Sequence, residues 1–142
     1  MTYNDTLTLV NRTEEVEKIP IFLEALCEAT GCNPAVSFNL NLALEEAVVN
    51  VIEYAYPKDG KEYTFTLNVQ AQQQNGAILL TFTLTDQGTP FDPTQTDDVD
   101  TTLSAQEREI GGLGIFLVRQ LMDDVSYQYV NGSNVLTMTK RV

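Results

Sequence analysis

The residues of this chain whose types and spacing could do chemistry begin with a carboxylate and an amide, Glu46 and Asn50. Because they are four residues apart, both project from one face of a helix, about one turn from each other. A carboxylate can deprotonate a hydroxyl or a water, and an amide oxygen is a neutral ligand suited to Mg²⁺. Apolar neighbours indicate partial burial, which would let Glu46 act as a base nearer neutral pH. Taken alone, the pair is more typical of the solvent-facing side of an amphipathic helix.

A further carboxylate, Asp86, follows a β-rich run and stands two residues before Gly88. A carboxylate at a strand end can accept a hydrogen bond from the exocyclic amine of adenine, and the glycine lets the base approach the backbone. By itself, Asp86-Gln87-Gly88 is more typical of an ordinary strand-ending turn, and the same interpretation fits Asp92-Pro93 even better.

The third feature is a glycine-rich segment, Gly111-Gly112-Leu113-Gly114, ahead of an apolar stretch with helical spacing. Glycines let a loop expose several N–H groups, and a helix N-terminus adds a partial positive charge, so such a segment can cradle phosphate. It is neither a Walker A motif nor a Gly-x-Gly-x-x-Gly fingerprint. A glycine hinge before a core helix would have the same sequence.

These residues need helices and strands to position them, and the apolar periodicity predicts both kinds. Pro20 within the first helical pattern indicates a kink or a late helix start, and Gly31 ends that pattern. Asn33 and Pro34 are typical of a helix start. Asn75-Gly76 and Asn131-Gly132 predict hairpins because both residue types tolerate positive φ.

The expected strands are 6–10, 63–69, 77–84, 125–130 and 135–140. The expected helices run from Thr13 to Gly31, from 34 to about 55 and from 112 to about 124.

This element order predicts an α+β fold. We expect a two-layer sandwich in which three helices cover one face of a mixed, mostly antiparallel sheet of about five strands. With 142 residues, the chain is expected to form one domain, residues 1–142. The aperiodic stretch from about Gln87 to Ile110, between the fifth predicted element and the last helix, is long enough to be functional.

Composition excludes several kinds of function. A net charge of −12 with eight basic residues argues against binding the nucleic-acid backbone. The chain has no histidine, so Ser–His–Asp hydrolysis and histidine phosphorylation within it are excluded. No run of apolar residues approaches the roughly 18 needed to cross a membrane, and the N-terminus lacks a signal pattern. We therefore expect a cytoplasmic protein that binds neither nucleic acid nor membrane.

The two cysteines, Cys27 and Cys32, leave three interpretations open: a disulfide, half of a metal site, or two inert small hydrophobes. Zinc is disfavoured because the chain has no histidine and no further cysteine. Since cytosolic disulfides are rare, two buried reduced thiols are the favoured interpretation.

The three chemistry-bearing segments, taken in order, resemble the N, G1 and G2 boxes of the GHKL ATPase superfamily, which has the Bergerat fold. Glu46-Ala47-Val48-Val49-Asn50 is similar to the first box, Asp86 to Pro93 to the second, and Gly112-Leu113-Gly114 to the third. The chain most resembles the bacterial anti-sigma-factor serine/threonine kinases of partner-switching systems, in its small size, in the Pro90-Phe91-Asp92-Pro93 extension and in the stretch from Gly111 to Asp124. This likeness covers nearly the whole chain.

The resemblance implies a role for each matching position. Glu46 would be the general base, Asn50 the Mg²⁺ ligand, and Asp86 the adenine contact with Gly88 beside it. Gly112, Leu113 and Gly114 would wrap the phosphates of ATP. Residues 94–110 would form a lid over ATP, and Arg108, its only basic residue, is our candidate for the γ-phosphate.

The chain also departs from the family pattern. Tyr54 stands where family members often have histidine, and Ile110-Gly111 where many have glycine followed by a basic residue. Since the lid contains no lysine, charge neutralisation must come from Mg²⁺, Arg108, backbone N–H groups and the helix dipole. These departures make nucleotide binding the safer expectation and phosphoryl transfer the less secure one.

The resemblance implies an ATP-dependent protein serine/threonine kinase that phosphorylates a small antagonist protein of the STAS type. A sigma factor as competing partner and a homodimer would follow from the same resemblance. The alternative is a nucleotide-gated binding module with little or no kinase activity, which the sparse lid cations favour. A third interpretation is the catalytic domain of a histidine kinase, which would need an acceptor histidine from another protein. Simple ATP hydrolysis, as in topoisomerases, is the least favoured interpretation.

Overall fold

The computed structural model describes residues 2–95 and 110–142. Its elements in chain order are β1 (Thr2–Val10), η1 (Thr13–Glu17), α1 (Lys18–Thr30), α2 (Pro34–Tyr54), β2 (Thr64–Gln74), β3 (Ala77–Asp86), η2 (Pro93–Gln95), α3 (Ile110–Leu121), β4 (Asp124–Val130) and β5 (Ser133–Arg141).

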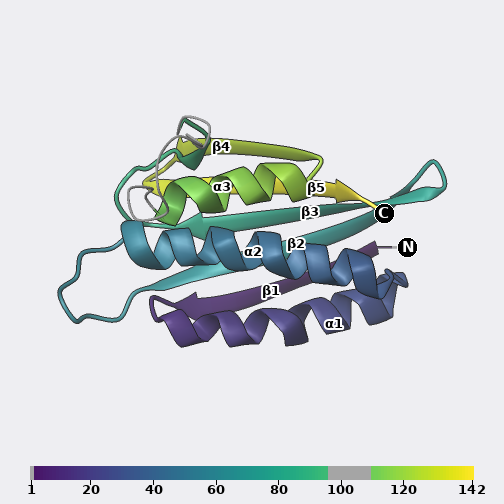
Figure 1. Cartoon of the computed structure of the whole chain (residues 1–142), viewed down its shortest axis with the longest axis horizontal. Helices are drawn as coiled ribbons and strands as arrows, with labels where there is room; N and C mark the ends of the chain where they lie inside the picture. The colour runs from purple at the N-terminus through teal and green to yellow at the C-terminus, as the bar shows by residue number, and fades with distance from the viewer. Residues whose placement is uncertain (1, 96–109) are drawn as a thin grey trace.

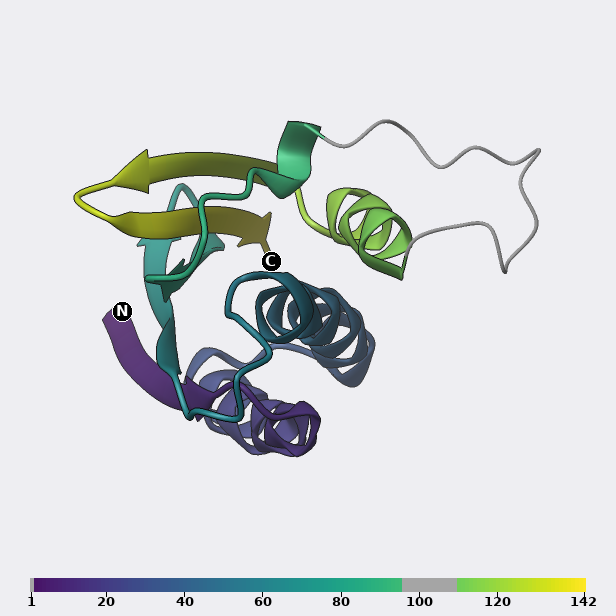
Figure 2. The ribbon, with the colours of Figure 1, turned by 90° about the vertical axis from the view of Figure 1, so that its left-hand side faces the viewer.

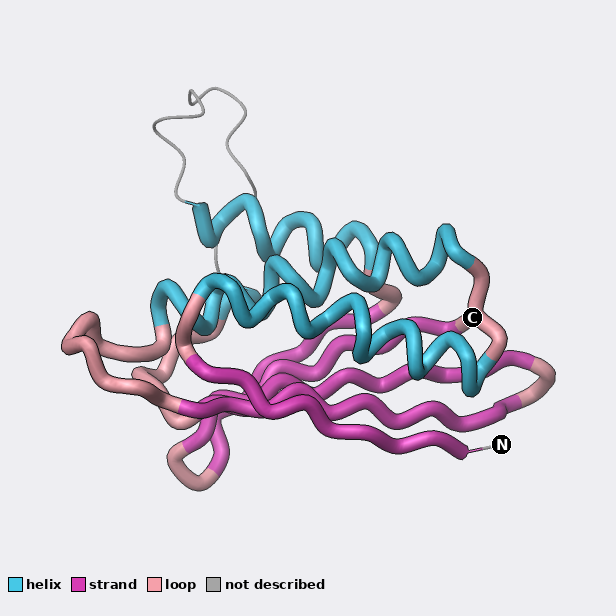
Figure 3. The backbone as a smooth tube through the Cα atoms, turned by 90° about the horizontal axis from the view of Figure 1, so that it is seen from below, coloured by secondary structure: helices cyan, strands magenta, loops and turns pink. Residues whose placement is uncertain are grey.

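The five strands form one sheet in the order β1-β2-β3-β5-β4, and the three long helices lie together on one of its faces (Figures 1 and 2). The opposite face carries no helix (Figure 3). The predicted α+β sandwich is therefore confirmed. The sheet is not mixed, however, because all four strand pairings are antiparallel.

The core lies between the sheet and the helices, and strand alternation builds it. In β2 every second residue is a buried apolar side chain, while Thr66 and Asn68 between them face the other side. The same period continues in β3 and β5, so the sheet presents one apolar face to the helices. These buried strand residues are Phe65, Leu67, Val69, Ala71, Leu80, Phe82, Leu84, Leu136 and Met138.

Helix α2 is the central element of the helical layer. Asn33 caps its N-terminus, where the side-chain oxygen accepts a hydrogen bond from the Val36 N–H at 2.9 Å, and Pro34 occupies the first turn, as predicted. By length and composition alone this helix could cross a membrane, although Glu45 and Glu46 interrupt its apolar residues. Its apolar residues instead pack into the core, among them Leu40, Leu44 and Val48.

Helix α1 begins later than the predicted start at Thr13. Residues Thr13–Glu17 form a 3₁₀ turn without a side-chain cap, and α1 proper starts at Lys18, which places Pro20 in its first turn. A proline is tolerated there because first-turn N–H groups have no partner inside the helix. Gly31 ends the helix with φ of 76°, as its position predicted.

The cysteine interpretation was wrong: Cys27 and Cys32 form a disulfide, with their Cα atoms 4.7 Å apart. The left-handed Gly31 turns the chain back after α1, which brings the two side chains together. The bond joins the last turn of α1 to the segment before α2.

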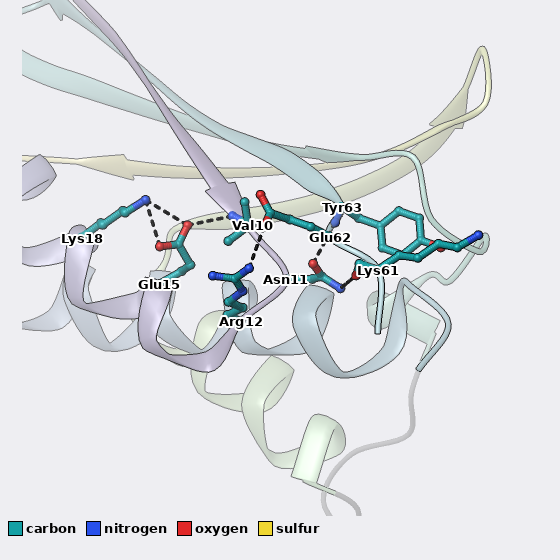
Figure 4. A network of polar contacts seen from close by, with 8 residues as sticks. All are labelled: Val10, Asn11, Arg12, Glu15, Lys18, Lys61, Glu62 and Tyr63. Atoms are coloured by element: carbon teal, nitrogen blue, oxygen red, sulfur yellow. Dashed lines mark hydrogen bonds and ion pairs between the residues drawn. The ribbon is translucent and has the colours of Figure 1, made fainter. Parts of the chain in front are cut away.

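The end of β1 is tied to the start of β2 and to the turn leading into α1 by a polar network (Figure 4). Asn11 accepts a hydrogen bond from the Tyr63 N–H at 2.8 Å, and its amide donates to the Lys61 carbonyl at 3.3 Å. Glu15 accepts from the Val10 N–H at 2.8 Å and pairs with Lys18. This network positions α1 beside the sheet from the strand end.

Candidate functional site

Asp86, the last residue of β3, lies buried at the helix-facing side of the sheet with 6% of its surface exposed. Its Oδ1 atom accepts two hydrogen bonds, from the Gly88 N–H at 2.9 Å and from the Asn134 amide at 2.8 Å. Among the residues that the structure describes, no hydrogen bond reaches Oδ2. One oxygen of this carboxylate is thus held in place and the other remains available to a ligand.

Asn134 is a site residue that the sequence interpretation missed. It pairs with Asp86 across the β3–β5 register and is 5% exposed. Its amide nitrogen also lies 3.0 Å from the Thr89 carbonyl, and its oxygen accepts from the Phe91 N–H at 3.1 Å and from the Tyr127 hydroxyl. The local sequence indicated only a hairpin at Asn131-Gly132. The placement of Asn134 depends on pairing with a strand some 50 residues earlier, which no local signal revealed.

A pocket opens between the C-terminal half of α2 and the ends of β3, β4 and β5. Its volume is about 420 Å³, including space open to solvent. It brings together Asn50 and Asp86, two of the predicted site residues, although they come from different elements. The pocket is lined by Ala47, Asn50, Val51, Ala55, Leu84, Asp86, Thr89, Phe91, Pro93, Tyr127, Asn134 and Leu136. The wall is mostly apolar with a few polar groups, as in many sites for small ligands.

Gly88 lies where only a glycine fits. A Cβ atom at this position would stand 2.2 Å from the Ala55 carbonyl oxygen, well inside van der Waals contact. The next residue, Thr89, donates its N–H to that same carbonyl at 2.7 Å. The absence of a side chain at Gly88 therefore allows the segment after β3 to approach the end of α2, a structural reason that the sequence interpretation did not consider.

Glu46 and Asn50 lie on α2 as the spacing predicted, but in different surroundings. Asn50 is buried at the pocket wall, and no hydrogen bond to its side chain occurs within the described part of the chain. Glu46 is half-buried one turn earlier and is not among the residues that line the pocket. Burial raises the pKa of Glu46 above its ordinary value, and the neighbouring Glu45 carboxylate raises it further.

The glycine segment lies within helix α3, which begins at Ile110 and ends at Leu121. Gly112, Leu113 and Gly114 thus belong to the first turns of this helix instead of a loop ahead of it, and the helix ends earlier than predicted. Of the expected lid, residues 96–109 and with them Arg108 lie outside the described residues.

Two contacts join the segment after β3 to the helices. Tyr54, which stands where the family often has histidine, stacks on Phe91 with ring centroids 5.9 Å apart. Arg119 of α3 donates a hydrogen bond to the Thr94 carbonyl in η2. The predicted second box is therefore held against α2, and the residue that follows it is held against α3.

Comparison with known proteins agrees with this architecture. The family model of the histidine kinase-like ATPase domain matches residues 9–140. A crystal structure of the RsbU and RsbW domains of a Mycobacterium tuberculosis protein shares the fold with a TM-score of 0.60 at 15% identity, covering 97% of this chain and 32% of that longer chain.

Curated relatives match over nearly the full length. The serine-protein kinase RsbW of Listeria monocytogenes serovar 1/2a is 30% identical over 141 residues, which cover 96% of this chain and 86% of the relative. The serine/threonine-protein kinase BtrW of Bordetella bronchiseptica is 27% identical over 135 residues, with 95% and 92% covered. The chain therefore belongs to the histidine kinase-like ATPase domain family, on the branch that holds the RsbW-type serine-protein kinases.

Proposed function

We propose that this chain is an ATP-dependent protein serine/threonine kinase of the anti-sigma-factor type, which phosphorylates a small antagonist protein of the STAS type. The observation that carries the proposal is the buried Asp86 carboxylate, whose Oδ2 atom is available in a mostly apolar pocket that Asn50 also lines. Family membership and the kinase names of the relatives support the same conclusion.

Adenine would occupy the end of the pocket at β3. The exocyclic amine would donate to Asp86 Oδ2, and apolar walls from Val51, Leu84 and Leu136 would cover the ring. A buried carboxylate with one oxygen already satisfied selects a donor at that point, because leaving the other oxygen unpaired on closing the pocket costs free energy.

Mg²⁺ fits Asn50 as a protein ligand. Its side chain is buried at the pocket wall and keeps its hydrogen-bonding capacity among the described residues. No group of three or more His, Cys, Asp or Glu side chains in the described part of the chain could hold a metal by itself. This agrees with a metal bound through one protein oxygen, phosphate oxygens and water, as Mg²⁺ often is, where it would neutralise phosphate charge.

Glu46 would act as the general base. The raised pKa of this carboxyl makes its carboxylate a better proton acceptor than that of an exposed glutamate. It would take the hydroxyl proton of the partner's serine as the serine oxygen bonds to the γ-phosphorus and the bond to the β-phosphate oxygen breaks. Gly112, Leu113 and Gly114, at the N-terminal end of α3, would stabilise the phosphates through the helix dipole, and Arg108 would contact the γ-phosphate.

The remaining parts of the proposal follow from the family resemblance. The kinase would work in the cytoplasm as a homodimer, and a sigma factor would compete with the antagonist for the same molecule. Residues 94–110 would serve as the lid over bound ATP.

A second candidate function is a nucleotide-gated binding module in which ATP only sets partner affinity. One observation favours it: no Lys or Arg occurs among the described residues that line the pocket. Fewer cations would leave less stabilisation for the charge that develops during phosphoryl transfer.

Transfer of labelled phosphate from ATP to a purified STAS-type antagonist decides between the two functions. We expect transfer by the wild type, and its loss in Glu46→Gln with ATP affinity retained, because the amide cannot accept the proton. Glu53→Gln, an exposed glutamate of the same helix, is the matched control and should transfer normally.

The direction in which the unfolding temperature of Glu46→Gln changes shows whether this variant is folded. A carboxyl whose pKa is higher in the folded state than in the unfolded state destabilises the fold at neutral pH. Glu46→Gln should therefore unfold at the same temperature as the wild type or higher. If the wild type binds ATP but transfers phosphate to no antagonist, the binding module is supported. If Asp86→Asn and Asn50→Ala both bind ATP as well as the wild type does, the proposed site is wrong.

A further inference from the structure

The contacts around Asn134 determine how its side-chain amide is oriented. The nitrogen faces three acceptors, Asp86 Oδ1 at 2.8 Å, the Thr89 carbonyl at 3.0 Å and the Gly88 carbonyl at 3.5 Å. The oxygen faces two donors, the Phe91 N–H and the Tyr127 hydroxyl. A flipped amide would set acceptor against acceptor on one side and donor against donor on the other, so only one orientation is compatible with these neighbours.

Tyr127 secures this orientation from β4. Its hydroxyl donates to the Asn134 oxygen, which it can do only while protonated. Burial raises the pKa of Tyr127 above its ordinary value, and the nearby Asp92 and Asp86 carboxylates raise it as well, outweighing the opposite effect of the Phe91 backbone N–H. The tyrosine therefore stays a donor throughout the range in which proteins function.

The Asn134 amide in turn determines how the Asp86 carboxylate presents itself. Together with the Gly88 N–H it occupies Oδ1, which leaves Oδ2 without a hydrogen bond among the described residues, on a carboxylate that lines the pocket. The same asparagine binds the backbone at Thr89 and Phe91, both of which also line the pocket. A single buried side chain thus links β5, the Asp86 carboxylate and the segment after β3.

We propose that Asn134, held by Tyr127, is the positioning residue that gives this site its selectivity for the 6-amino group of adenine. This inference rests on the proposed function, because it assumes that the base of ATP meets Asp86. Asn134 does not touch the base in this account. It acts through Asp86, by holding the carboxylate in the one orientation that directs Oδ2 at the amine.

The test compares two nucleotides in each variant, ATP and the triphosphate of purine riboside, which is ATP without the 6-amino group. Their affinity ratio reports the hydrogen bond to Asp86 and cancels contributions from phosphate and metal. We expect the wild type to prefer ATP by about 10-fold or more, as for a hydrogen bond to a charged group, and Asp86→Asn to lose that preference.

Asn134→Ala should reduce the preference to about threefold or less while leaving the affinity for the triphosphate of purine riboside nearly unchanged, since a misaligned hydrogen bond loses most of its strength. Tyr127→Phe should show a smaller reduction in the same direction, and it retains the ring if Asn134→Ala fails to fold. Thr137→Ala, on the same strand but on the sheet face without helices, is the matched control and should keep the wild-type ratio.

The outcomes separate this inference from the proposed function. If Asp86→Asn loses the preference but Asn134→Ala and Tyr127→Phe keep it, or if both nucleotides weaken equally in these two variants, the positioning role is wrong and the site assignment stands. If the wild type shows no preference for ATP, the adenine contact at Asp86 is wrong and the inference is overturned with it.

Discussion

Asp86 and Glu46, the two carboxylates of the proposed site, have different environments, and that difference supports the roles proposed for them. Asp86 is almost fully buried, yet one oxygen is satisfied by two hydrogen bonds, which suits a fixed acceptor. Glu46 is half-buried beside another carboxylate, and its pKa is raised, which suits a proton acceptor. A residue of the first kind contributes to binding, whereas one of the second kind contributes to the chemical step.

The acidic limb of the pH profile tests the role of Glu46. A base with a raised pKa is ionised only above that pKa, so phosphoryl transfer should rise with pH through it. Glu45→Gln removes the neighbouring charge, so the pKa of Glu46 should fall and the midpoint of this limb should move to lower pH. The measurement is the initial rate of phosphate transfer to the antagonist across the acidic range.

The matched control for this profile is Glu53→Gln. Glu53 lies on the same helix, but it is exposed and pairs with Lys58, so its substitution should leave the midpoint where it is in the wild type. A midpoint that does not move in Glu45→Gln, or that moves to higher pH, would show that another group limits the reaction.

At the scale of elements, the predictable features were those with a local cause. Asn33 caps α2, Gly31 ends α1, and Asn75 and Asn131 adopt positive φ in hairpins, because each depends on a few neighbouring residues. The antiparallel pairing of β3 with β5 has no local signal, so the Asp86–Asn134 contact could not be predicted. The disulfide was missed because a general expectation about the compartment outweighed the close spacing of Cys27 and Cys32.

The contact between the end of α2 and the segment after β3 gives a prediction for Gly88→Ala. The added Cβ would stand 2.2 Å from the Ala55 carbonyl oxygen, a backbone atom that cannot rotate away. Overpacking of this kind costs about 1–3 kcal/mol, and relief would need the segment carrying Thr89 and Phe91 to shift. We expect the free energy of unfolding to fall by that amount and the affinity for ATP to fall with it, as measured by chemical denaturation and nucleotide titration.

Gln87→Ala is the matched control because it changes an exposed side chain in the same turn and leaves the backbone intact. It should unfold within about 0.5 kcal/mol of the wild type, as surface substitutions usually do. Wild-type stability in Gly88→Ala would mean that α2 and this segment can separate without cost, and that their contact does not shape the pocket.

The charge of the whole molecule matters for a ligand that is itself an anion. The chain carries a net charge of −12, and several of its cations are already paired with acids. The ion pairs in the described residues are Arg12–Glu62, Lys18–Glu15, Lys58–Glu53 and Lys140–Asp123. Because no basic side chain occurs among the described residues that line the pocket, the long-range electrostatic field of the acidic chain should repel a nucleoside triphosphate there.

This repulsion predicts an unusual dependence on salt. Raising the ionic strength from about 0.01 M to about 0.15 M shortens the Debye length from about 30 Å to about 8 Å. Screening should therefore speed the association of Mg·ATP by about two- to threefold. At a site lined with basic residues, the same increase in salt would slow association. Stopped-flow mixing with a fluorescent ATP analogue measures the rate constant.

Adenosine provides the internal control, since it presents the same base to Asp86 without any charge. Its association rate should not change with salt if the effect arises from the field of the acidic chain acting on the phosphates. A rate for Mg·ATP that falls as salt rises would contradict the argument. It would show that a local cation, such as Arg108 in the expected lid, outweighs the net charge of the molecule at the moment of encounter, because attraction by that cation would then be what the salt screens.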